Sequence, residues 1–556
     1  MPSRNDIAMT GRLLAGVLTV VLAVWLVLLW RGLHHSLWFD DSYMFYRYAF
    51  NVRHGLGVSW NYDAVHTYGE TALLWGLVVL VLSYLPMNAS QVLILGSWLC
   101  SVGAVVAMAW AVRSATEPEQ RGLGGWQVMA LLAVPLVLVD NFRYHARSGM
   151  DAMLGVALCA VFLALALLWA RGRIAPEIAS LAGLLLYATR PEGAMIVVLV
   201  PVLMVLVWRK GSLAGLARLL GTFVACIAVE LLLCKLYFHT ALPLSFYMKS
   251  RNGYEGYMRY WHPTFQLGEF LAGCALYLAV MVWAARRQDA RMLSVFVVPV
   301  LCMAVYLNSV LQIMNDCSRY YLPYLPLLLV PALVVLDRRM GDGMGWWKLH
   351  ATHGLALRLV GLACLVLLCW PGLRRRVALA VDRTIERKQY AYDPVVLQTA
   401  ASGKLPVMQE IWKTVPDQIF ATLPAGATVA SSEVGYLGAR LQSVNVIDLE
   451  GLNDTQIALQ GFRMPDLLER RPDAIWMPHP DYTWQRGVMM TDPEFLRQYE
   501  LYRDAALSGI AIRRDSPYRA QLEANLQKSY PGVVIADSLV TAASWSGKKH
   551  VVVDTE

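Results

Sequence analysis

Charged residues are scarce in this sequence, and their scarcity limits the class of protein that it can encode. Only 16% of the 556 residues are Asp, Glu, Lys or Arg, whereas 57% are hydrophobic. The mean hydropathy is +0.45. One water-soluble core cannot hold so large an apolar fraction, so most of the chain should lie in lipid. The composition predicts a polytopic α-helical membrane protein.

Several sequence signatures of soluble enzymes and metal proteins are also missing. The nine cysteines have no C-x-x-C spacing and all precede residue 373, nearly always inside apolar segments. They are interpreted as packing residues rather than a disulfide framework or a zinc site. His34 and His35 lack a third histidine nearby and are expected to be interfacial. Residues 373–556 contain no nucleophile elbow, P-loop or metal motif.

The basic residues are placed as in a membrane protein. A net charge of +8 would suggest nucleic acid as the partner of a soluble protein. Here the arginines and lysines gather in short loops between apolar runs, where they orient helices, so no nucleic-acid partner is predicted. Residues 10–30 exceed a signal peptide's apolar core and lack a small-x-small cleavage site, which favours a retained first span.

Twelve apolar runs precede residue 373. They cover residues 10–30, 71–86, 92–112, 126–139, 151–170, 176–189, 194–208, 218–237, 267–285, 292–311, 321–336 and 354–371. If all of them crossed, the basic loops would fall on alternating sides of the membrane. The short run 71–86 is therefore expected to be a juxtamembrane or re-entrant helix, which leaves about eleven spans. Loops 31–70, 140–150, 238–266 and 312–320 then face the non-cytoplasmic side.

Two domains are predicted. Residues 1–372 form the membrane domain with functional outer loops. Residues 373–556 form an extracytoplasmic (periplasmic) α/β domain, because short apolar alternations such as 427–434, 444–451 and 473–480 predict strands separated by helical stretches. No internal repeat stands out, which disfavours a transporter built on inverted repeats.

Two adjacent carboxylates follow the first span. Asp40 can be explained as the N-cap of a helix through 42–54 that ends at Gly55 and Gly57. A cap needs one acceptor, so this interpretation leaves Asp41 unexplained. Two carboxylates at a membrane surface suit a general base with a partner that binds hydroxyl groups or a cation.

Short motifs along nearly the whole chain resemble those of the C-type (GT-C) membrane glycosyltransferases. In chain order they are Asp40 with Asp41, Arg47, Tyr48, Asn51, Gly55 and Gly57; Trp60-Asn61; Tyr68-Gly69-Glu70-Thr71; Leu74-Trp75; Ser148-Gly149-Met150-Asp151; Thr189-Arg190-Pro191-Glu192-Gly193; Leu242 through Lys249; Asp316 and Arg319 before Tyr321-Leu322-Pro323; and Val446 through Asp454. Leu244 stands where the family has asparagine, and the usual glycine pair before Asp316 is missing. Within the family the chain is most similar to the mycobacterial-type terminal arabinofuranosyltransferases and related bacterial proteins.

The resemblance implies a multi-pass enzyme of the bacterial cytoplasmic (inner) membrane. It would transfer arabinofuranose from a polyprenyl-phosphate donor to an arabinan or related glycan acceptor at the outer face. The alternatives within this class are another sugar, or a pilin or lipopolysaccharide acceptor. From other classes, a transporter or flippase of lipid-linked sugars and a glycan-binding scaffold remain open.

The predicted site combines carboxylates and cationic groups. Asp40 and Asp41 are the catalytic pair, with Asp41 favoured as the base. The phosphate candidates are Arg190, Lys249 and Arg319; the residues expected to assist the acceptor or a metal are Asp151, Tyr68 and Glu70. Either no cofactor is needed, or Asp40, Asp41 and Asp151 hold Mg, Mn or Ca.

Structural explanations compete with several of these roles. Arg190 can pair with Glu192, Arg319 can pair with Asp316, and Asp151 can cap the helix after it. In the C-terminal domain, Asp448, Asn453 and Asp454 either cap a turn or bind the glycan acceptor.

Overall fold

The computed structural model describes residues 4–33, 37, 39–63, 65–250, 263–309, 316–342, 413–478, 482–504 and 507–535. It divides into two compact units. The first unit comprises Met1–Leu37, Leu93–Glu230 and Trp261–Arg387, and the second comprises Trp38–Val92, Leu231–Tyr260 and Lys388–Glu556. The domain boundary predicted at residue 372 lies outside the described residues and stays a prediction.

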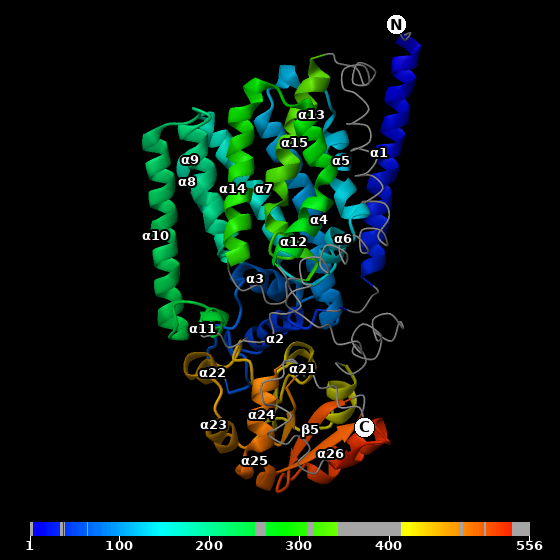
Figure 1. Cartoon of the computed structure of the whole chain (residues 1–556), viewed down its shortest axis with the longest axis vertical. Helices are drawn as coiled ribbons and strands as arrows, with labels where there is room; N and C mark the ends of the chain where they lie inside the picture. The colour runs from blue at the N-terminus through cyan, green and yellow to red at the C-terminus, as the bar shows by residue number, and fades with distance from the viewer. Residues whose placement is uncertain are drawn as a thin grey trace, which may run out of the picture. The chain divides into compact units, whose positions relative to one another are not determined.

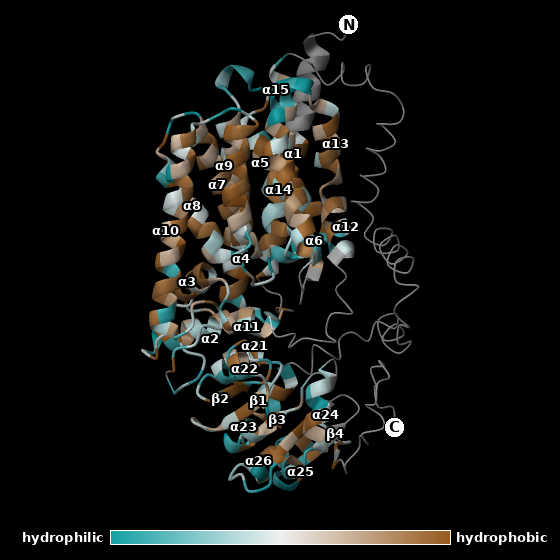
Figure 2. Cartoon of the chain, turned by 60° about the vertical axis from the view of Figure 1, so that its left-hand side comes forward, coloured by the Kyte–Doolittle hydropathy of each residue, from teal (hydrophilic) through white to brown (hydrophobic). Residues whose placement is uncertain are grey.

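The first unit is a bundle of apolar helices (Figures 1 and 2). Its helices are α1 (Arg4–Gly32), α4 (Ala89–Ala115), α5 (Gly125–Leu138), α6 (Asp140–His145), α7 (Ala152–Ala170), α8 (Pro176–Thr189), α9 (Gly193–Leu206), α10 (Leu213–Phe238), α12 (Pro263–Gly273), α13 (Ala275–Ala284), α14 (Ala290–Ser309) and α15 (Leu325–Gly341), of which α4 and α10 continue into the second unit. Short turns of 3₁₀ helix complete it: η1 (Pro118–Gln120), η3 (Arg287–Asp289), η4 (Asp316–Ser318) and η5 (Leu322–Tyr324).

Helix α7 forms part of the core of this bundle. It is apolar on all sides, and packing against α8, α9 and η5 buries residues on every face of it. Gly155 allows Pro323 to approach, since an added Cβ would lie 3.2 Å from the proline Cγ. This packing holds the ends of α7, α8 and η5 together.

Four helical segments of the described residues are long and apolar enough to cross a membrane. They are α4, α7, α10 and Arg287–Ser309; α12 and α13, bent by 57° at a break, would make a fifth if they form one span. The other predicted runs in the described part of the chain are shorter apolar helices or stop short of these criteria. The count of about eleven spans stays a prediction, and run 354–371 lies outside the described residues.

The second unit contains a mixed sheet with helices around it. Strands β1 (Thr428–Ser431), β2 (Asn445–Asp448) and β3 (Ala474–Trp476) are parallel, whereas β4 (Tyr499–Asp504), β5 (Leu507–Arg513) and β6 (Val534–Ile535) extend the sheet antiparallel in the order β2-β1-β3-β5-β4-β6. The helical elements are α21 (Gly435–Arg440), α22 (Thr455–Gln460), α23 (Met464–Glu469), α24 (Thr483–Thr491), α25 (Pro493–Gln498), α26 (Arg519–Ser529) and a π-helical turn, η6 (Val415–Ile419). The three segments that were predicted to form strands contain β1, β2 and β3.

Three helices from the loops of the first 250 residues belong to this unit: α2 (Ser42–Arg53), α3 (Leu73–Leu82) and α11 (Leu244–Ser250). Helix α2 has the predicted extent, and Gly55 and Gly57 follow it with φ of 79° and 70°, values that favour glycine. The ten residues of α3 rise roughly 15 Å, about half of a bilayer core. A helix of this length is too short to cross.

Candidate functional site

Asp40 bonds to a helix of the C-terminal segment. Its carboxylate accepts hydrogen bonds from the backbone N–H groups of Gly435 (2.7 Å) and Tyr436 (2.8 Å) at the start of α21. A carboxylate at this position satisfies unpaired amide groups and complements the positive end of the helix dipole. The side chain therefore caps α21 rather than α2, whose own N-cap residue is Asp41.

Arg47 binds the opposite end of the same helix. Its guanidinium is fully buried and stacks on Trp60 at 4.7 Å. It donates to the carbonyls of Trp60 (2.6 Å), Gly438 (2.9 Å), Val444 (2.8 Å) and Leu441 (3.2 Å), and to Asn61 Oδ1 (3.3 Å). Burial lowers the pKa of Arg47 to about 9, because the loss of contact with water disfavours the charged form.

Asp40 and Arg47 together form what we call the α21 clamp. The two residues are seven positions apart, about two helical turns, so they reach from one side of α2. The anion binds the N-terminal end of α21 and the cation its C-terminal end, which makes α2 and α21 run in the same direction. Sequence reasoning missed this clamp, although the i, i+7 spacing of the two charges was visible.

Burial also alters the acidity of Asp40. Desolvation, with Glu433 and Asp41 adding negative charge, raises the pKa of Asp40 to about 7, despite the two backbone hydrogen bonds that oppose this shift. Asp41 is half-buried and makes no side-chain cap bond with α2. The two carboxylates thus lie in different environments.

This shift gives the clamp a pH dependence. Between the ordinary Asp pKa of 3.8 and about 7, the folded chain holds a proton that the unfolded chain has released. We expect the thermal stability of the native chain, relative to Asp40→Asn, to be highest below about pH 4 and to fall as pH rises through about 7. Unfolding midpoints of both proteins in detergent across this range measure the difference, and a constant difference would contradict the expectation.

The clamp is tight at Gly435. A Cβ there would lie 2.6 Å from the carbonyl carbon of Asp40 and 2.8 Å from its Oδ2. We expect Gly435→Ala to reduce the unfolding free energy by about 1 to 3 kcal/mol, because the backbone of residue 40 must move. The control is Gly221→Ala on α10, where nothing lies within 4 Å of the added carbon; equal stability of the two variants would exclude the tight contact.

The signature 446–454 forms a hydrogen-bonded turn. Asp448 Oδ1 accepts from the amide of Glu450 (3.0 Å), and Asp448 Oδ2 accepts from the amide and side-chain nitrogen of Asn453 (both 2.8 Å). Asn453 Oδ1 accepts from the Tyr48 hydroxyl of α2 (3.0 Å).

Asp454 caps α22 through the amide of Ile457 (3.0 Å) and pairs with Arg470 (2.6 Å). Burial raises the pKa of Asp448 to about 7. These contacts account for the three side chains as turn-forming groups, and glycan binding by them stays a prediction.

Tyr68 and Glu70 are buried next to the same turn. A Cβ added at Gly69 between them would lie 2.8 Å from the carbonyl of Leu452. Tyr68 stacks on Phe238 at 4.7 Å, and burial raises the pKa of Glu70 well above its ordinary value. Lys249, at the end of α11, is half-buried. The described residues of 39–92 and 231–250 thus belong to the same packed unit as those of the C-terminal segment.

The first unit brings three of the predicted residues together. Asp151 binds Arg190, with Oδ2 2.6 Å from Nε and Oδ1 3.0 Å from Nη2, and its Oδ1 also lies 3.5 Å from Arg319 Nη2. Glu192 is farther from Arg190, at 3.7 Å. Both guanidinium groups lie over the ring of Tyr320. Asp151 therefore holds two arginines side by side and makes no side-chain cap bond with α7. The side chain of Asp316 lies outside the described residues, so its pair with Arg319 stays untested.

The turn before Arg319 is strained. Cys317 and Ser318 have φ of 53° and 63°, a region that costs a non-glycine residue about 1 kcal/mol or more. The amide of Ser318 donates to Gln266 Oε1 (2.7 Å), and its hydroxyl donates to the Gln266 carbonyl (2.8 Å). His145 Nε2 lies 3.2 Å from the Cys317 carbonyl. These bonds fix the turn that directs Arg319 toward Asp151, a feature without a local sequence signal.

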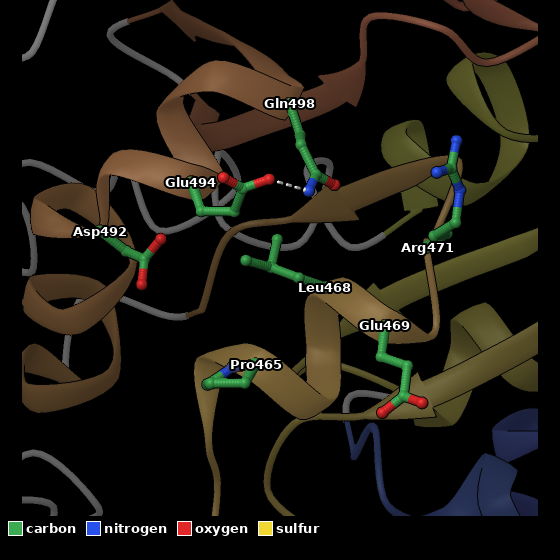
Figure 3. A pocket seen from close by; sticks show the side chains of 7 residues that line it. All are labelled: Pro465, Leu468, Glu469, Arg471, Asp492, Glu494 and Gln498. Carbon is green, nitrogen blue, oxygen red and sulfur yellow. Dashed lines mark hydrogen bonds between the residues drawn. The ribbon is translucent and has the colours of Figure 1, made fainter.

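In the described part of the chain, no three His, Cys, Asp or Glu side chains are placed to hold a metal ion. The divalent cation stays a prediction. A separate surface cavity of about 440 Å³ lies in the C-terminal domain, lined by Pro465, Leu468, Glu469, Arg471, Asp492, Glu494 and Gln498 (Figure 3). It contains none of the predicted site residues.

Comparison with known proteins establishes the fold. Residues 407–532 match a family described as "Domain of unknown function (DUF8728)". No curated protein matches the sequence. Two solved structures of ArnT from Cupriavidus metallidurans, one in the apo state and one bound to undecaprenyl phosphate, match with a TM-score of 0.52 each. Their identities are 17% and 16%, and the matches cover 89% and 90% of this chain and 98% of each ArnT chain. The chain has an ArnT-like membrane fold.

Proposed function

We propose that this protein transfers a sugar from a polyprenyl phosphate to an acceptor hydroxyl at the outer face of the cytoplasmic membrane. The observation that carries the proposal is the shared fold with ArnT, a C-type polyprenyl-phosphate-dependent glycosyltransferase. One of its structures contains undecaprenyl phosphate, the chemical class of the donor carrier. The ordered sequence motifs of the same enzyme class support the proposal independently.

Asp41 is the general base in this mechanism. Asp40 is committed to the start of α21, whereas Asp41 is half-buried beside it. As the acceptor oxygen forms its bond to the anomeric carbon, Asp41 takes the hydroxyl proton. The bond between that carbon and the phosphate oxygen breaks, and polyprenyl phosphate leaves with the electron pair. Asp40 acts as a positioning residue that holds the base on the C-terminal domain.

The cationic residues hold the donor phosphate. Arg190 and Arg319 are presented as a pair by Asp151, and guanidinium groups match phosphate oxygens in geometry and charge. Lys249 supplies a further positive charge from α11. In this scheme Asp151 positions the arginines, and Tyr68 and Glu70 shape the acceptor side of the loop.

The proposed sugar is arabinofuranose and the proposed acceptor an arabinan or related glycan, as the sequence resemblance implies. The C-terminal domain, whose helix α21 packs against α2, would guide the acceptor toward Asp41. A cation at the carboxylates would assist by polarising the acceptor oxygen.

The test is the release of free polyprenyl phosphate by the purified chain. Polyprenyl-phospho-arabinofuranose with an arabinan acceptor should give release that depends on the acceptor. If only a hexose donor gives release, the protein is still a glycosyltransferase, but the assignment of arabinofuranose as its sugar is wrong. If no donor gives release, but the protein moves lipid-linked sugar across the membrane of proteoliposomes, the protein is a transporter and the proposal is wrong.

A further inference from the structure

A cavity unrelated to the predicted site lies beside the C-terminal end of α1 in the first unit. Its volume is about 190 Å³, and its lining residues are Trp25, Leu28, Leu29, Leu136, Arg143 and Arg147. Helix α1 ends at Gly32, so the apolar part of the lining starts within roughly 10 Å of the helix end at a rise of 1.5 Å per residue. Lipid headgroups meet acyl chains at this depth from the end of an apolar helix.

The two arginines at this cavity differ in their partners. Arg143 forms an ion pair with Asp140 and donates to the Val137 carbonyl (3.4 Å). The methylene groups of Arg147 pack over Gly32, where an added Cβ would lie 3.5 Å from Cδ. No carboxylate among the described residues pairs with Arg147. Partial burial and the adjacent charge of Arg143 lower the pKa of Arg147, so an anion there would relieve repulsion between the two groups.

We propose that this cavity binds an anionic phospholipid of the bilayer, whose phosphate lies between Arg143 and Arg147. Its acyl chain would cover Trp25, Leu28 and Leu136. One cation remains uncompensated after Arg143 pairs with Asp140, which matches the single charge of a phosphodiester. A phosphomonoester such as polyprenyl phosphate carries a charge nearer two. The inference is independent of the proposed function, because its ligand is a bulk lipid and its test measures no sugar transfer.

The experiment is native mass spectrometry of the full chain titrated with phosphatidylglycerol, phosphatidylcholine and undecaprenyl phosphate. Phosphatidylglycerol should bind most tightly, and Arg147→Gln should weaken it about tenfold or more, as expected for a lost charged hydrogen bond. Arg147→Lys keeps the charge and should retain affinity within about threefold. Arg147 is exposed, so these variants should fold, which thermal unfolding checks.

Arg173→Gln is the matched control. Arg173 is 57% exposed and pairs with Glu117 at 3.5 Å, away from the cavity. Its replacement should leave phosphatidylglycerol binding unchanged. Equal binding of the anionic and zwitterionic lipids, or equal losses in Arg147→Gln and Arg173→Gln, would overturn the site. If undecaprenyl phosphate binds more tightly than phosphatidylglycerol, the ligand of the cavity is the donor carrier and the proposal is overturned.

Discussion

Asp41→Asn is expected to lower the rate of sugar transfer by about 100-fold to 10,000-fold, the range that a positioned general base contributes. Asparagine has nearly the same shape but cannot take the acceptor proton. Asp41 makes no side-chain cap bond with α2, so α2 should begin at the same residue. Donor binding and thermal stability should therefore stay close to those of the native chain. Single-turnover release of polyprenyl phosphate measures the loss.

Two variants show whether this loss belongs to Asp41. Asp63→Asn removes an exposed carboxylate of the same loop and should leave the rate unchanged. Asp40→Asn should weaken the α21 clamp, so it should lower stability together with rate, whereas Asp41→Asn should lower the rate alone. A native rate in Asp41→Asn would remove this residue from the chemistry and leave Asp40 as the candidate base.

Asp151→Asn is expected to lower the unfolding free energy by about 3 to 5 kcal/mol, the usual cost of removing one partner from a buried ion pair. The side chains of Arg190 and Arg319 are only 6% and 10% exposed. Without the carboxylate they lose the anion that both of them contact. Denaturant unfolding in detergent measures the change, and donor binding should weaken because the guanidinium groups are no longer held side by side.

Glu192→Gln provides the comparison for Asp151. Glu192 contacts Arg190 at 3.7 Å and its side chain is 16% exposed, so its replacement should cost about 1 kcal/mol or less. Adding Arg319→Gln to Asp151→Asn should restore part of the stability, since it removes one uncompensated charge. If Asp151→Asn costs no more than Glu192→Gln, the cluster is not held by Asp151.

Local patterns were sufficient to predict many of the elements. The apolar runs located the bundle helices because lipid-facing and buried helix faces are both hydrophobic. Short apolar stretches within residues 427–434, 444–451 and 473–480 predicted β1, β2 and β3. Almost every residue of these strands is buried, because strands of a parallel sheet are covered on both faces. The short run 71–86 contained α3, whose length excludes a crossing.

Partners distant in sequence were not predictable. Nothing near Asp40 indicates that its hydrogen-bond donors are 395 and 396 residues away, so its capping role was assigned to the adjacent helix. Asp151 was also considered as a local cap, whereas its carboxylate pairs with arginines 39 and 168 residues later. The left-handed conformation of Cys317 and Ser318 depends on bonds to Gln266 and His145. Cysteine and serine do not favour this conformation by themselves, so nothing in the sequence indicated it.

The α21 clamp has a consequence for biosynthesis. Arg47 and its acceptor Gly438 are separated by 391 residues, which takes roughly 20 to 80 s to translate at about 5 to 20 residues per second. Throughout this interval the guanidinium of Arg47 lacks its carbonyl acceptors at Gly438, Leu441 and Val444, so residues 39–63 cannot complete their packing until that segment has been made. Truncation before α21 would therefore leave Arg47 without these acceptors, and we expect proteases to cut residues 39–63 more readily in the truncated chain.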